Sequence, residues 1–211
     1  SAGYKVPENL LVHGYLNIGG KKMSKSTGNT IDPLHLLKTY QADSVRYSLL
    51  RNSVFDDSDY SEEILIERHN NELANKLGNL VSRVSALAEK YGIEKVAKPH
   101  LVTTKTLKDV SEHFDNYELH KAIESIFHYI DKANEYIQDK KPWETQDTKV
   151  LYELVFAIRN ASILLSPFLP DTAEKISKIF HFSIDLKELD KPLKIAKIKK
   201  SEILFKKIWI N

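Results

Sequence analysis

The feature that most constrains the fold is a long helical pattern that begins at Ser61. Ser61-Glu62-Glu63-Ile64 resembles a capping box, and apolar residues then recur at helical spacing as far as Tyr91-Gly92. Further amphipathic segments are expected at residues 105–113, 119–139, 147–165 and 171–180, and prolines at 142, 167 and 170 mark the ends of two of them. The sequence therefore predicts a mainly α protein in which residues 61–211 form an antiparallel helix bundle.

The first 60 residues have a different pattern. Residues 10–18 favour a short strand that runs into the turn Gly19-Gly20, and a loop rich in lysine and serine follows to Asn29. Asp32-Pro33 is typical of a helix start, and two short helices broken near Gln41-Ala42 are expected after it. We interpret residues 1–60 as a small α/β element that precedes the bundle, and we expect short β-like runs in the tail after residue 180.

Composition excludes several classes of function. The chain has no cysteine, which removes disulfides and thiolate metal sites and fits a reducing cytoplasm. No apolar run approaches the roughly 20 residues of a membrane span, so no membrane partner is expected. The net charge of +2 indicates local rather than general contact with nucleic acid. Because the chain begins with Ser1 rather than Met, we expect it to be part of a longer protein.

No metal site is predicted. The eight histidines lack the spacing of metal ligands. Asp56, Asp57 and Asp59 offer oxygens that suit a cation, but we favour a solvated acidic loop as their explanation.

The loop after the glycine turn carries the first candidate site. It contains the run Lys22-Met23-Ser24-Lys25-Ser26, in which two ammonium groups three residues apart accompany two hydroxyls. Such a group can surround a polyphosphate and stabilise the negative charge that develops during phosphoryl chemistry. The alternative is a flexible, solvated surface loop.

Two places in the helical part suggest contact with RNA. Asn79 and Arg83 are four residues apart, so they share a helix face, and together they offer an amide and a guanidinium for base edges. Pro142-Trp143 follows a long helix and offers a flat ring on which a base can stack. The alternatives are ordinary surface polar residues and a tryptophan that fills the core.

A family resemblance joins these sites. The run from Gly20 to Asn29 resembles the second signature motif of class I aminoacyl-tRNA synthetases, and Val12-His13-Gly14-Tyr15 and the segment 43–51 resemble the methionine-specific members. The resemblance implies that Lys25, with Lys22, holds the phosphates of ATP, which binds with Mg²⁺. It also implies that Asn79, Arg83, Pro142 and Trp143 read the anticodon of tRNA(Met).

The resemblance further implies what this chain should lack. The first signature of the family, the methionine pocket and the zinc-binding insertion all lie upstream in the family and are absent here. We therefore expect a C-terminal portion of a methionine–tRNA ligase that is inactive without its N-terminal catalytic part. Two alternatives remain open, namely a stand-alone tRNA-binding module and the matching region of another class I synthetase.

Overall fold

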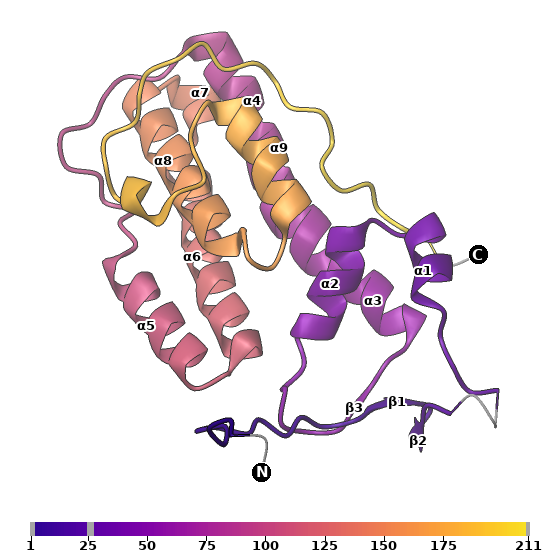
Figure 1. Cartoon of the computed structure of the whole chain (residues 1–211). Coiled ribbons are helices and arrows are strands. Elements are labelled where there is room, and N and C mark those ends of the chain that lie inside the picture. Colours follow the sequence, from indigo (N-terminus) through magenta and orange to yellow (C-terminus); the bar gives the residue numbers. More distant parts are fainter. Residues whose placement is uncertain (1–2, 25–27, 210–211) are drawn as a thin grey trace.

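The computed structural model describes residues 3–24 and 28–209, which are mostly helical and carry one small sheet (Figure 1). Strand β1 (Leu16–Ile18) pairs antiparallel with β2 (Lys21–Lys22) and parallel with β3 (Ser58–Asp59). The expected strand over 10–18 is therefore confirmed only for its last three residues. Residues 10–15 lie outside any strand and are largely exposed. Single backbone hydrogen bonds, such as the one from the Gly14 nitrogen to the Val54 carbonyl at 2.9 Å, join this segment to the chain before β3.

Two short helices follow the loop, as the sequence predicts. Helix α1 (Pro33–Thr39) begins at Asp32, whose side chain accepts a hydrogen bond from the Leu34 backbone nitrogen at 2.9 Å. Helix α2 (Ala42–Leu50) begins after Gln41. Both pack on a small core with the next helical run, and Leu36, Val45, Tyr60 and Leu65 are buried there.

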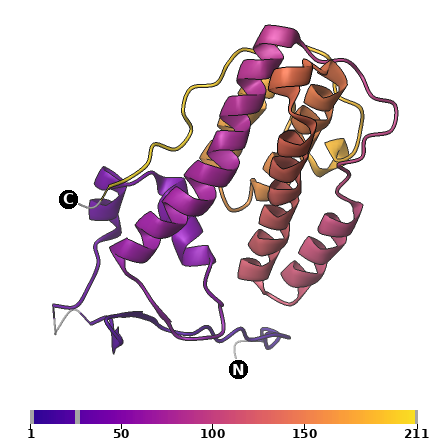
Figure 2. The ribbon, with the colours of Figure 1, turned by 180° about the vertical axis from the view of Figure 1, so that it is seen from behind.

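The longest helical run is continuous but changes its hydrogen-bond register. Helix α3 (Glu62–Arg68) passes into the π-helical segment η2 (His69–Gly78) and then into α4 (Asn79–Tyr91), and Figure 2 shows the run from end to end. The expectation of one α-helix from 61 to 91 is therefore wrong for its middle part. The reason lies in a strict four-residue period of side chains that are at most 2% exposed: Leu65, His69, Leu73, Leu77, Val81 and Ser85.

In an α-helix of 3.6 residues per turn, a step of four residues drifts by about 40°, so five such steps would turn the row by about 200°. The wider turns of η2, with i→i+5 hydrogen bonds, remove this drift and keep the row buried. Gly78 fits this geometry, because a Cβ there would lie 3.1 Å from the Leu73 carbonyl oxygen.

The remaining helices surround a larger core. They are α5 (Thr104–Asp115), α6 (Leu119–Lys140), α7 (Pro142–Thr145), α8 (Thr148–Leu165) and α9 (Pro170–Phe180). Helix α8 packs against α4, α6 and α9, and every residue from Val150 to Leu165 is buried. A helix buried on all sides is a core helix, which explains its apolar sequence. In the described part of the chain, no helix is long and apolar enough to cross a membrane.

The tail after α9 contains a short 3₁₀ turn, η3 (Leu186–Glu188), and then an extended segment. The expected β-like runs are wrong for the described residues of the tail, none of which joins a strand. The tail instead lies along α4 and returns to α1 (Figure 1). Its contacts are made by buried side chains and by single hydrogen bonds, such as the one from the Ser201 backbone nitrogen to the Ser85 hydroxyl at 3.0 Å.

Candidate functional sites: a phosphate loop and an anticodon interface

The lysine-serine loop starts from a tight hairpin. Gly19 and Gly20 both have positive φ, 58° and 71°, which is the requirement of a two-residue type I′ turn between β1 and β2. The Gly20 backbone nitrogen donates to the Asp59 carboxylate at 2.9 Å, and the Tyr15 nitrogen donates to Asp57 at 2.7 Å. These two acids therefore serve as acceptors that hold the hairpin.

Asn29 closes the base of the loop. The Ser24 backbone nitrogen donates to the Asn29 carbonyl at 3.1 Å, and the Asn29 amide donates at 3.4 Å to the carbonyls of both Ile18 and Lys21. The loop is thus tied at both ends to the sheet. Lys25 and Ser26, which the sequence predicts for ATP binding, lie outside the described residues, whereas Lys22, Met23 and Ser24 lie within them.

Lys22 is held over an aromatic ring that we did not predict from the sequence. Its Nζ lies 3.8 Å from the centroid of the Tyr15 ring, which is a cation–π contact. Lys22 is exposed, so this contact positions the ammonium at the foot of the loop without removing it from solvent. The one available signal was the pairing of β1 with β2, which brings Tyr15 and Lys22 to the same end of the hairpin.

The predicted RNA-reading residues come together at the other end of the molecule (Figure 1). The Arg83 guanidinium on α4 lies 5.0 Å from the centroid of the Trp143 ring on α7. Asn79 is exposed one turn before Arg83 on the same helix. The structure therefore brings Arg83 and Trp143 into contact, with Asn79 one helical turn away, and Pro142, the residue before Trp143, is buried.

The backbone between α6 and α7 sets the position of Trp143. Helix α6 ends at Lys140, Lys141 adopts a left-handed conformation with φ of 45°, and Pro142 starts the four-residue helix α7. Trp143 is half-buried, packs against the larger core, and donates its indole N–H to Glu144 at 3.2 Å. The ring therefore has both a packing role and a side that meets Arg83.

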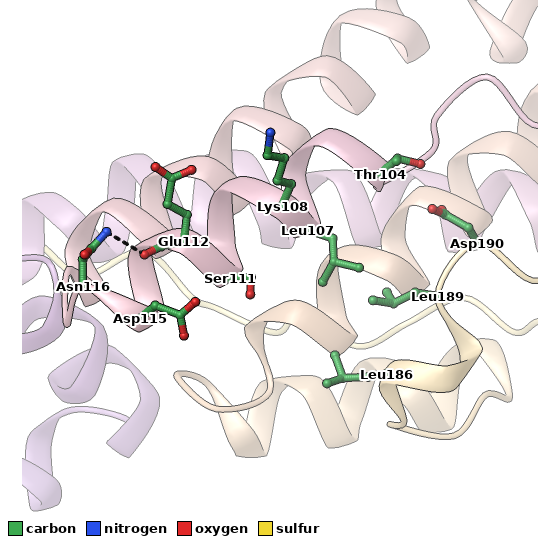
Figure 3. A pocket seen from close by; sticks show the side chains of 10 residues that line it. All are labelled: Thr104, Leu107, Lys108, Ser111, Glu112, Asp115, Asn116, Leu186, Leu189 and Asp190. Carbon is green, nitrogen blue, oxygen red and sulfur yellow. Dashed lines mark hydrogen bonds between the residues drawn. The ribbon is translucent and has the colours of Figure 1, made fainter.

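One groove in the described part of the chain lies away from both candidate sites. It has a volume of about 640 Å³ and lies between α5 and the η3 turn, as Figure 3 shows. Leu107, Leu186 and Leu189 line its apolar side, and Asp190 is already bonded to Thr103 and Asn160. None of the described residues predicted for either site lines this groove. Within residues 3–24 and 28–209, no group of three or more histidines and carboxylates is arranged to hold a metal.

Two family models match successive parts of the chain. The family model described as "tRNA synthetases class I (M)" matches residues 1–85, and the model "Anticodon-binding domain of tRNA ligase" matches residues 102–210. Methionine–tRNA ligase of Thermotoga maritima is 36% identical, over 86% of this chain and 32% of its own length. The same enzyme of Clostridium perfringens is 34% identical, over 99% of this chain and 36% of its own length.

Solved structures give the same result. Mycobacterium tuberculosis methionyl-tRNA synthetase in complex with methionyl-adenylate is 30% identical, with a TM-score of 0.84 over 95% of this chain and 44% of that one. Its apo form is 26% identical and also has a TM-score of 0.84. The chain spans about a third of the length of the curated relatives it matches.

Proposed function

The chain belongs to the methionyl-tRNA synthetase family of class I aminoacyl-tRNA synthetases, and we propose that it acts as the C-terminal portion of such a ligase. In this role residues 1–60 supply the loop that stabilises the phosphates of ATP while methionyl-adenylate forms. Residues 61–211 form the antiparallel bundle of an anticodon-binding domain and bind the anticodon of tRNA(Met). Side chains from both sides of this boundary share the smaller core, among them Tyr60 and Leu65.

The observation that carries the proposal is the cation–π contact between Arg83 and Trp143, with Asn79 one turn away. A flat ring stacks on an unpaired base, and a guanidinium or amide reads the edge of a base. An anticodon loop presents unpaired bases of this kind.

The loop supports the ligase over a stand-alone RNA-binding module. Lys22 is held at the foot of a loop that is closed by Asn29, and Lys25 lies within that loop in the sequence. Ammonium groups suit phosphate oxygens, so these lysines would stabilise the charge on the β- and γ-phosphates as the α-phosphate is attacked. Mg²⁺ would arrive with the nucleotide and neutralise part of the same charge.

The proposed partners follow from the roles of the loop in ATP binding and of the bundle in anticodon binding. The reaction needs the N-terminal catalytic part, which carries the amino-acid pocket and the zinc-binding insertion in the family. The match to one methionine-specific family model and to methionine–tRNA ligases favours methionine over the other class I specificities. We place the assembled enzyme in the cytoplasm, where tRNA charging takes place.

The decisive experiment compares RNA binding with catalysis. The chain alone should bind a stem-loop with the methionine anticodon more tightly than the same stem-loop with a changed anticodon. It should show only background methionine-dependent ATP–pyrophosphate exchange, and exchange should appear when the N-terminal part is supplied. Equal binding of both stem-loops would contradict the anticodon role, and exchange by the chain alone would contradict its catalytic incompleteness.

A further inference from the structure

The extended tail that follows η3 is strongly basic. Between residues 191 and 207 the sequence has seven lysines and a single acid, Glu202. This excess stands out in a chain whose total charge is only +2. The tail therefore concentrates positive charge along one line of the surface.

The backbone of the tail is fixed to the helices. Ile198, Leu204 and Phe205 are buried. The Ser201 backbone nitrogen and hydroxyl both contact the Ser85 hydroxyl, at 3.0 and 3.1 Å. Toward the N-terminal end of the same helical run, the Lys206 carbonyl is hydrogen-bonded to the Nε2 of the buried His69 at 2.8 Å.

Asn70 continues this attachment to the end of the described chain. Its amide donates to the Ile208 carbonyl at 2.8 Å and its oxygen accepts from the Ile208 nitrogen at 2.9 Å. At the start of the segment the Arg159 guanidinium donates to the Lys191 carbonyl at 2.7 Å, so both ends of the basic segment are fixed. The lysines are presented by a backbone that is already ordered, which lowers the entropy cost of binding.

The side chains of all seven lysines are exposed, and six of them make no ion pair within the described residues. Of the seven, Lys191 alone pairs with a carboxylate, Glu188, and within the described residues no ion pair involves the other six, which are Lys194, Lys197, Lys199, Lys200, Lys206 and Lys207. Ile198 is buried between the exposed Lys197 and Lys199, which is the alternation expected of an extended chain. Burial of the apolar residues therefore turns the ammonium groups toward solvent.

The position of this segment relates it to the proposed anticodon interface. Ser201 contacts Ser85 and Lys206 contacts His69, so the tail runs antiparallel to this helical run. Lys199 and Lys200 therefore lie just beyond Ser85 toward the C-terminal end of α4, and Arg83 lies two residues before Ser85. Two residues of an α-helix correspond to a rise of about 3 Å, and the helix with its side chains is about 10–12 Å wide.

Arg83 and Ser85 also point to different sides of α4, because two residues differ by about 200°. Arg83 contacts α7 on one side of the helix, and Ser85 contacts the tail on the other. The exposed ridge of α4 separates them. An RNA that reaches Arg83 and Trp143 across this ridge would bring its backbone within reach of the tail.

We propose that Lys197, Lys199 and Lys200 form a phosphate-binding strip for the RNA backbone that flanks the anticodon, continued toward the sheet by Lys206 and Lys207. The inference rests on the proposed function, since it assigns the sugar-phosphate backbone of the same RNA to a second surface. Lysines spaced along an extended chain bind phosphates as point charges and carry no base preference. Selectivity then belongs to Arg83 and Trp143, and the strip contributes affinity.

The test is a salt titration of RNA binding by the 211-residue chain. The variant has Lys197→Gln, Lys199→Gln and Lys200→Gln together, and the matched control has Lys105→Gln, Lys108→Gln and Lys132→Gln. The control removes the same charge from exposed lysines of α5 and α6, which lie outside the proposed strip. Each protein is titrated with a full-length tRNA bearing the methionine anticodon and with the same tRNA carrying a changed anticodon.

We expect the tail variant to show a plot of log K against log salt whose slope is shallower by about two to three, close to one for each phosphate that is no longer neutralised. Both RNAs should weaken by the same factor, the ratio between them should not change, and the control should match the unmodified chain. The unfolding temperature should be unchanged, because all six substituted lysines are exposed.

Other outcomes separate the two proposals. An unchanged salt slope in the tail variant, or a loss confined to the matched RNA, would overturn the strip. Binding of polyglutamate that depends on the tail lysines, together with RNA binding that does not, would also overturn it and assign the surface to acidic protein. If the unmodified chain bound both RNAs equally while the tail variant had a shallower slope, the strip would stand and the anticodon role would fail.

Discussion

The carboxylate of Asp43 on α2 accepts two hydrogen bonds from Thr172, 129 residues later, one from its backbone nitrogen at 2.7 Å and one from its hydroxyl at 2.6 Å. Through these bonds Asp43, which is 2% exposed, caps the first turn of α9, the helix that begins with Pro170. Next to it, Arg46 donates to the carbonyls of Phe168 and Pro167 at 3.0 and 2.9 Å. Helix α2 thus joins the part that carries the loop to the turn between α8 and α9.

Asp43→Ala should lower the free energy of unfolding by about 1–3 kcal/mol. It leaves the buried donors of Thr172 without an acceptor and removes a negative charge from the start of α9. Urea unfolding followed by circular dichroism measures the change. Asp171→Asn is the matched control, because Asp171 is exposed in the same helical turn and its replacement should cost less than about 0.5 kcal/mol. Equal midpoints for both variants would show that the cap contributes nothing.

Arg83→Ala and Trp143→Ala should each weaken binding of RNA with the methionine anticodon by roughly 1–3 kcal/mol, because the first removes a group that reads a base edge and the second removes a stacking surface. Binding of RNA with a changed anticodon should hardly change, because that complex does not use these groups. Titration against both RNAs measures the difference. Trp143 also packs on the core, so thermal unfolding of each variant must accompany the titration. A large loss of stability with equal weakening for both RNAs would assign Trp143 to the core.

Lys25→Ala in the complete enzyme should slow adenylate formation about 10²–10³-fold, by analogy with the removal of one oxyanion-hole donor, and leave tRNA binding nearly intact. Lys22→Ala should act in the same direction, since it removes the ammonium held over Tyr15. Lys21→Ala is the control, because Lys21 is an exposed neighbour on the same strand and bonds to Asn29 only through its carbonyl. Single-turnover adenylate formation decides the matter, and equal rates in all three variants would make these lysines ordinary surface residues.

The stability of the chain should depend on pH through His69. Its ring lies between the Ser44 hydroxyl and the Lys206 carbonyl, each at 2.8 Å, and burial lowers its pKa below the ordinary value. Because the unfolded chain binds this proton more readily, the free energy of unfolding should be highest above about pH 6.5, the unfolded pKa, and should fall as the pH drops below it.

The comparison of His69→Gln with the original chain between pH 5 and 7 isolates this contribution. The variant should be less stable near pH 7, and the difference between the two proteins should narrow toward pH 5. Urea unfolding at several pH values provides the measurement. Parallel curves over the whole range would mean that His69 does not titrate differently in the two states.

Much of the architecture could be read from the sequence because its signals are local. Asp32 and Ser61 accept hydrogen bonds at the helix starts where they were expected, and the apolar periodicity located α5, α6, α8 and α9. Gly19-Gly20 indicated the turn between β1 and β2 for the same reason, since two adjacent glycines allow positive φ at both central positions.

Other features depended on contacts between distant segments. The four-residue period from Leu65 to Ser85 was present in the sequence. Such a row can either wind around a regular α-helix or stay in line through π-helical turns. The choice depended on the two cores into which these side chains pack. The tail residues have β-like composition but lie along α4, where buried side chains and the Ser85 hydroxyl hold them in place of a neighbouring strand.

The same division applies to the candidate sites. The sequence by itself determined which chemical groups are present: the lysines of the loop, an amide and a guanidinium on one helix face, and a tryptophan after a proline. Only the tertiary structure decided that Arg83 meets Trp143, that Tyr15 lies beside Lys22, and that the basic tail flanks α4. The physical reason is that helix and turn preferences act over a few residues, whereas these pairings follow from how complete helices pack to bury their apolar faces.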